Sequence, residues 1–359
     1  MRIKLVALLA ALLAALLLTA CDQSVPQQKG FAGMGAQAQA FTPVVPGRVF
    51  SFPADHGAHD GFRIEWWYVT ANLKDQQGND FGVQWTLFRS ALKPEAEQPG
   101  WGNQTVWLGH AAVTSSTVHH AAERYARGGV GQAGVRLAPF EAWIDDWMFA
   151  GKAADPLSDM QLSARDKNFA YDLRLTSSRP LVLQGDKGFS QKSEQGQASY
   201  YYSQPFFQAS GTLQIDGQTY TVSGPAWLDR EWSSQPLTAN QTGWDWFSLH
   251  LDSGEHVMLY RMRQKEGAAY LTGTWIAADG QIQTLRSEQI SLVPQDTAEV
   301  AGRSMPVKWW VRIPDKRLDI SVDALNRDAW MDLRIPYWEG PVGIGGSHAG
   351  RGYLEMTGY

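Results

Sequence analysis

The pattern that most constrains this chain is the recurrence of short runs in which apolar and polar residues alternate. From residue 22 onward these runs are separated by Gly, Asp-Gly or Asn, and helical periodicity is nearly absent. An alternation of period two is typical of half-buried β-strands, and the separating residues are those of tight turns. The sequence therefore predicts an all-β protein built from antiparallel hairpins.

Two of the predicted hairpins resemble each other. Residues 67–73 and 82–89 flank the turn sequence DQQGN, and residues 247–251 and 256–263 flank DSG. Each pair opens with tryptophans beside a carboxylate and closes in arginine. Many strands in two similar halves predict two antiparallel β-barrels in tandem, over residues 47–214 and 215–359, with the boundary near 214–225. Residues 117–125 and 140–149 are left for short helices or irregular loops. No period of about 40 residues repeats four times, which argues against a propeller.

The first residues predict a lipid anchor. Arg2 and Lys4 precede an apolar run over residues 5–18, which is shorter than the roughly 20 residues of a membrane span. Small residues then lead to Cys21, as in a bacterial lipoprotein signal over residues 1–20. Residues 21–46, poor in large apolar side chains, are expected to form a tether, with the lipid on Cys21. By the lipoprotein sorting rule, Asp22 favours the periplasmic face of the inner membrane.

Composition narrows the class of partner. The formal net charge is −5 and the sequence has no Lys/Arg cluster, which argues against nucleic acid. Cys21 is the only cysteine, so no disulfide can form within the chain. Sixteen Trp, 14 Phe and 12 Tyr are a heavy aromatic load, which favours a pocket for a large apolar small molecule.

Acidic and indole side chains are most concentrated over residues 224–247. This stretch holds four tryptophans and the carboxylates Asp229, Glu231 and Asp245. A carboxylate buried against indoles is costly to ionise, so its pKa rises and it can donate a proton near neutral pH. We take Asp229 as the best candidate acid, followed by Glu231 and Asp245, and expect acidic side chains at the entrance of the second repeat to lie sheltered among indoles inside a β-built cup; which barrel holds the pocket stays open. The competing interpretation is an ion-pair cluster with neighbouring arginines.

Eight motifs together carry a family resemblance. They are residues 52–59 (FPADHGAH), 62–69 (FRIEWWYV), 84–89 (QWTLFR), 200–203 (YYYS), 227–232 (WLDREW), 243–247 (GWDWF), 337–340 (YWEG) and 352–359 (GYLEMTGY). In this order they resemble the AttH and carotenoid 1,2-hydratase-like family of secreted proteins. The resemblance covers residues 48–359 and implies two lipocalin-like β-barrel domains. Some members hydrate carotenoids, the fold is shared by cyclase-like enzymes acting on polyenes, and many lipoprotein members are described only as predicted hydrolases.

The resemblance also implies site residues. In the hydratases a histidine follows the aspartate of the motif that matches residues 227–232, whereas this chain has Arg230, which puts carotenoid hydration in doubt. Because neighbours on a strand face opposite sides, Trp66 and Trp67 cannot both face one interior, and one of them is expected to pack between the domains. The predicted ligand-binding residues are Glu65, Trp66, Trp67, Arg230, Trp232, Trp244, Trp246, Tyr260, Glu339, Tyr353 and Glu355.

Other chemistries find little support. His56 and His59 have no clear third ligand nearby, so we expect no metal and no other cofactor. Ser347 lies in a sequence that lacks the second glycine of a nucleophile elbow.

Two functions remain open, besides a third possibility in which the two barrels pack on a membrane protein and bind no ligand. The first is a lipid-anchored protein that binds a hydrophobic, isoprenoid or lipid-like molecule, beside an ABC-type transport system. The second is a hydratase, cyclase or hydrolase of the same fold that uses Asp229 as general acid.

Overall fold

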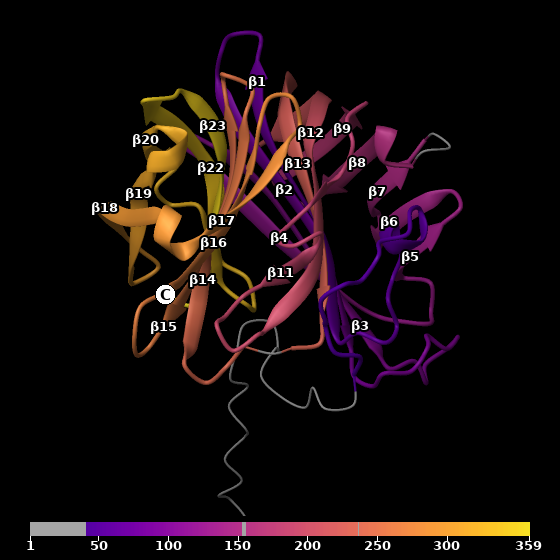
Figure 1. Ribbon diagram of the computed structural model, residues 1–359. Coiled ribbons are helices and arrows are strands. Elements are labelled where there is room, and N and C mark those ends of the chain that lie inside the picture. The colour runs from indigo at the N-terminus through magenta and orange to yellow at the C-terminus, as the bar shows by residue number, and fades with distance from the viewer. Residues whose placement is uncertain (1–40, 153–155, 236) are drawn as a thin grey trace, which may run out of the picture.

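The computed structural model describes residues 41–152, 156–235 and 237–359, and these residues form an all-β protein (Figure 1). Two large antiparallel sheets curl side by side, the first into a near-barrel and the second into a half-barrel. The helical pieces are single turns of 3-10 helix at Ala54–His56, Pro156–Ser158, Ser287–Gln289 and Pro314–Lys316. Over the described residues, none of the helices could span a bilayer. The all-β prediction is confirmed.

The first sheet takes up the chain to residue 233. Its central order is β4-β3-β2-β1-β13-β12-β9-β8-β7-β6-β5, with β10 and β11 also paired to β12. The strands are β1 (Ile64–Asp75), β2 (Asp80–Ala91), β3 (Thr105–Ser115), β4 (His119–Arg127), β5 (Ala133–Leu137), β6 (Phe140–Ile144), β7 (Trp147–Gly151), β8 (Asp159–Arg165), β9 (Phe169–Thr176), β10 (Val182–Leu183), β11 (Phe189–Gln191), β12 (Ala198–Ile215) and β13 (Gln218–Ser233).

The second sheet has the order β17-β16-β15-β14-β23-β22-β20-β19-β18, with β21 paired to β22. Its strands are β14 (Gln241–Leu251), β15 (His256–Gln264), β16 (Tyr270–Ile276), β17 (Ile282–Arg286), β18 (Ser291–Val300), β19 (Arg303–Ile313), β20 (Leu318–Ala324), β21 (Trp330–Met331), β22 (Tyr337–Gly346) and β23 (Gly350–Met356). Both predicted look-alike hairpins are present, as β1–β2 and β14–β15.

Two sequence-based expectations differ from this arrangement. The expected boundary after residue 214 falls in the β12–β13 hairpin, whose turn is Asp216-Gly217, and β13 pairs with β1 in the first sheet. The break between the sheets therefore lies at residues 234–240. The stretches expected to be helical or irregular, 117–125 and 140–149, are instead strand β4 and the β6–β7 hairpin.

Strand alternation divides the apolar side chains among three layers. Trp67, Trp85 and Trp107 fill the interior of the first sheet, while Phe247 and Trp309 lie in the interior of the second. A third cluster lies between the sheets and contains Tyr68, Tyr201, Trp227, Trp246, Met258 and Tyr260, with Trp66 and Trp244 packed against it. The two sheets thus pack through their outer faces, and Trp66 and Trp67 diverge as the alternation predicts.

Removing an interior indole should be costly. Trp85 is fully buried, so Trp85→Ala should lower the free energy of unfolding by roughly 3–5 kcal/mol. Trp101→Ala is the matched control, because Trp101 is 77% exposed and its loss should change stability by less than about 0.5 kcal/mol. Urea denaturation followed by circular dichroism would measure both. Equal effects would contradict the assignment of Trp85 to the core.

Candidate functional site

Strand β13 distributes its charged residues between two environments. Because successive side chains point to opposite faces, Asp229 and Glu231 face the second sheet, whereas Arg230 and Trp232 face the interior of the first. All four are nearly inaccessible to solvent. Residues 229–232 therefore contribute side chains to two separate sites.

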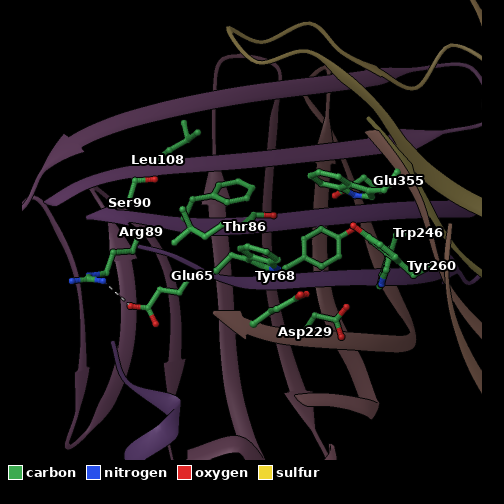
Figure 2. Close-up of a pocket in the computed structure, with 15 residues that line it drawn as sticks. Glu65, Tyr68, Thr86, Arg89, Ser90, Leu108, Asp229, Trp246, Tyr260 and Glu355 are labelled. Carbon is green, nitrogen blue, oxygen red and sulfur yellow. Dashed lines mark hydrogen bonds and ion pairs between the residues drawn. The ribbon is translucent and has the colours of Figure 1, made fainter. Parts of the chain in front are cut away.

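The main pocket lies between the two sheets, where Asp229 and Glu231 emerge, and in neither barrel interior (Figure 2). It contains about 750 Å³ of space free of protein atoms, including the part open to solvent. The lining residues are Ile64, Glu65, Trp66, Tyr68, Thr86, Phe88, Arg89, Ser90, Leu108, Asp229, Glu231, Trp244, Trp246, Tyr260 and Glu355.

Asp229 is a buried carboxyl held by neutral groups. The hydroxyls of Tyr201 and Ser203 donate to it at 2.5 Å each, and the indole N–H of Trp227 donates at 2.6 Å. Burial raises the pKa of Asp229 to about 7, although these three hydrogen bonds oppose the shift. A carboxyl with this pKa exists in both protonation states near neutral pH and can therefore transfer protons.

Glu355 is a second, half-buried carboxyl of the pocket and comes from the other sheet (Figure 2). The indole N–H of Trp244 donates to it at 2.5 Å, and burial raises the pKa of Glu355 to about 7. The neighbouring indole of Trp246 donates to the Tyr201 hydroxyl at 3.2 Å, so it is linked to Asp229 through that tyrosine. The pocket thus places a titratable carboxyl on each of two walls, among aromatic rings.

A buried polar chain continues from the pocket wall. The hydroxyl of Tyr68 donates to Glu339, which also bonds Tyr337, and the Tyr337 hydroxyl lies 2.9 Å from Nδ1 of His110. Burial, with Glu355 nearby, raises the pKa of Glu339 well above its ordinary value. Glu339 is therefore a buried, hydrogen-bonded acid behind Tyr68 and does not itself line the pocket.

Glu231 is a carboxylate of the pocket that forms an ion pair with a cation. Lys192 Nζ lies 2.9 Å from it, and the Ser199 hydroxyl donates to it. The lysine also lies over the rings of Tyr201 and Tyr260, at 4.9 and 4.5 Å from their centroids. This ion pair suits polar recognition at the pocket better than proton donation.

Glu65 belongs to an ion cluster on the inner face of the first sheet, although it also reaches the pocket wall. Arg230 contacts it at 2.6 Å and Arg89 at 3.1 Å, and the His59 ring lies at 3.0 Å. Burial alone would raise the pKa of Glu65, but Arg230, His59 and Arg89 together hold it well below its usual range. His59 stacks on Trp232 with centroids 4.0 Å apart. The cluster fixes the 54–63 segment to the sheet.

Asp245 is also paired with cations. Arg261 lies 3.3 Å away, Arg263 forms a second ion pair, and the Tyr359 hydroxyl donates at 2.9 Å. Burial raises the pKa of Asp245 against the opposing effect of both arginines. Asp245 faces the interior of the second sheet and does not line the pocket, so Asp229 is the predicted acid that best fits a proton donor there.

The predicted ligand-binding residues divide in the same way. Glu65, Trp66, Trp244, Trp246, Tyr260 and Glu355 line the pocket. Glu339 and Tyr353 lie between the sheets without lining it, whereas Trp67, Arg230 and Trp232 are on the inner face. Tyr68, Tyr201 and Ser203 were not predicted. The YYYS motif contains the last two, and its pairing with β13 sets Ser203 opposite Asp229.

Histidines form small polar groups without a metal-like ligand set. His56 is hydrogen-bonded to Tyr202 at 2.6 Å, and Nδ1 of His250 lies 3.0 Å from Nδ1 of His256. In the part of the chain that the structure describes, no three His, Cys, Asp or Glu side chains converge as metal ligands.

Comparisons with known proteins identify a family model and solved structures that this chain resembles. A family model described as AttH-like matches residues 43–359. A crystal structure from Nitrosomonas europaea, assigned provisionally to AttH, is 35% identical, with a TM-score of 0.78, and the match covers 89% of this chain and all of that one. No protein with a curated description matches the sequence significantly.

Two more distant structures share the fold. Kievitone hydratase from Nectria haematococca is 15% identical with a TM-score of 0.66, over 88% of this chain and 95% of that one. CghA, crystallised with Sch210972, is 12% identical with a TM-score of 0.58, over 90% and 97%.

The environment of Asp229 predicts a pH-dependent stability. The pKa of Asp229 rises from 3.8 in the unfolded chain to about 7 in the folded protein, so the unfolded chain loses this proton first as pH rises. The folded state is therefore stabilised by this proton at low pH, and that stabilisation is lost as pH rises from 3.8 to about 7. Relative to wild type, Asp229→Asn should gain about 1.4 kcal/mol in free energy of unfolding per pH unit in that window. Urea denaturation over a pH series would measure this difference. The exposed Asp166→Asn should show no such trend, and a flat profile for both variants would mean that Asp229 is ionised in the folded protein.

Proposed function

The chain belongs to the AttH-like family, and from that premise we propose that it binds a hydrophobic, unsaturated small molecule between its two sheets and adds water to it or removes water from it. The observation that carries this proposal is the Asp229 carboxyl. It is buried, all three of its hydrogen-bond donors are neutral, and its pKa of about 7 suits general acid catalysis.

The chemistry of the pocket fits proton transfer to carbon. In the hydration direction, the Asp229 proton is added to one alkene carbon, which leaves a cation on the other. The faces of Trp66, Trp246 and Tyr260 can stabilise that cation. Water then forms the new C–O bond and loses a proton to ionised Glu355, so the substrate gains one water in total. Proton exchange through solvent restores Asp229 and Glu355.

The likeness to kievitone hydratase supports this reaction class, because a protein named for water addition uses the same fold. The carotenoid substrate of the resembling hydratases is not carried over. At the position of their histidine, Arg230 points away from the pocket and pairs with Glu65, so its role here is structural.

A second candidate is a carrier that holds the molecule without changing it. The predicted lipobox at Cys21 favours it, since an anchored protein beside an ABC-type transporter would need only to capture a ligand and release it. Cys21 lies outside the described residues.

The two candidates differ in their response to Asp229→Asn. Wild-type protein and the variant would be incubated with a total lipid extract from a bacterial envelope, and native mass spectrometry would identify bound species. If the protein is an enzyme, only the wild type should yield a product that differs from the bound species by one water, with turnover at least about 100-fold lower in the variant. A carrier would bind equally in both proteins and release the species unchanged. Asp166→Asn is the matched control.

Lipidation of Cys21 is tested separately. Wild-type protein should fractionate with the inner membrane and carry acyl chains in its mass spectrum, while Cys21→Ala should be released from that fraction. An unacylated wild-type protein would exclude the proposed anchor without affecting the proposed pocket chemistry.

A further inference from the structure

Most of the large apolar side chains that are exposed in the described residues lie in loops near one end of the first sheet. Trp101 is 77% exposed and Leu92 is 61% exposed, both in the loop between β2 and β3. Others lie in the segment before β1 or at the tip of the β5–β6 hairpin. We call this group the apolar rim: Val45, Val49, Phe52, Leu92, Trp101 and Leu137.

The strand register shows that these loops share one end. Ile64 at the start of β1 pairs with Ser90 near the end of β2 and with Ser233 at the end of β13. The segment before β1 and the β2–β3 loop therefore leave the sheet on the same side. The Leu137 side chain lies beside Gly57 in that segment, and the β1–β2 turn is at the opposite end (Figure 1).

The pocket extends to this same end. Ile64, Ser90 and Leu108 line the pocket in the first rows of the sheet at this end, and Asp229 lies further along the strands. The backbone N–H of Leu92 donates to the carbonyl of Gln104, which continues the β2–β3 pairing. Leu92 follows Ser90 by two residues and so continues the pocket face of β2 toward the rim.

The chemistry of the rim fits a bilayer surface. Isolated exposed apolar residues are common, but here a tryptophan and aliphatic side chains are concentrated beside the mouth of an apolar pocket. Indole rings favour the membrane–water interface. Lys93, Glu95 and Glu97 in the same loop mix both signs of charge, so contact would depend on apolar insertion more than on attraction to anionic lipid.

The place where the described part of the chain begins also indicates a lipid bilayer as the partner. The first described residue, Phe41, precedes the rim segment directly, and Thr42 is bonded to Gly61 beside the start of β1. A tether from Cys21 would therefore reach the body at the rim end. We propose that the apolar rim rests on the lipid bilayer surface, with the pocket mouth opening toward the membrane, so that a hydrophobic substrate enters from the lipid phase. This inference rests on the proposed function, because it uses the lipidation of Cys21 proposed there.

Single-cysteine labelling of the full chain provides the test. Cys21 is the only natural cysteine and would be blocked by acylation, so Trp101→Cys introduces one free thiol. The labelled, acylated protein would be reconstituted into vesicles of phosphatidylethanolamine and phosphatidylglycerol, with a polarity-sensitive fluorophore at position 101. Gln76→Cys, on the exposed β1–β2 turn, is the matched control. Leu92→Cys is a second rim variant in case the first fails to fold.

Docking predicts opposite responses at the two ends. Fluorophores at positions 101 and 92 should shift to the blue and be quenched by doxyl-labelled lipid, with roughly fivefold less quenching by aqueous iodide than at position 76. Equal iodide quenching at both ends of an acylated protein would overturn the proposed docking. Mass spectrometry of Cys21 separates this outcome from a missing anchor. If the protein is unacylated, the same labels would be placed in a Cys21→Ala background, so that each variant again has one thiol, and read with vesicles added at increasing concentration. If vesicles leave the fluorescence of the labels at positions 101 and 92 unchanged in the unacylated protein, the proposed docking is also overturned.

Discussion

The site depends on water exclusion by two sheets that pack through their outer faces. The carboxyls of Asp229, Glu339 and Glu355 lie in this layer, each hydrogen-bonded to phenol, hydroxyl or indole groups. Neutral donors stabilise a carboxylate less than a cation does, so burial dominates and raises all three pKa values. If the sheets separated, water would replace the aromatic layer and these carboxyls would ionise as ordinary surface groups.

The same molecule buries other carboxyls in the opposite manner. Glu65 and Asp245 lie on the inner faces of the two sheets, and each is paired with two arginines. Removing one partner from such a buried cluster is strongly destabilising, which suits a role in holding segments together. The alternation of β13 places Arg230 in a structural cluster while its neighbour Asp229 remains available for chemistry. Stability and reactivity are thereby assigned to opposite faces of one strand.

Much of this arrangement is predictable from local pattern. The look-alike hairpins, the divergence of Trp66 and Trp67, and the burial of Asp229 and Glu231 follow from alternation and composition. The position of the pocket does not, because it depends on which outer faces meet. The Asp216-Gly217 turn resembles a domain junction although it closes a long hairpin within one sheet. Likewise, Tyr201 reaches Asp229 through cross-strand register, which no single stretch of sequence encodes.

Separating the cores from the cleft has an evolutionary consequence. The residues that fill each sheet interior and those that face the pocket occupy alternate positions on the same strands, so a substitution in one set leaves the packing of the other largely intact. Descendants of such a scaffold can exchange acids, bases and aromatic rings in the cleft while both folded bodies persist. Distant homologues are therefore expected to diverge in substrate and reaction sooner than in architecture.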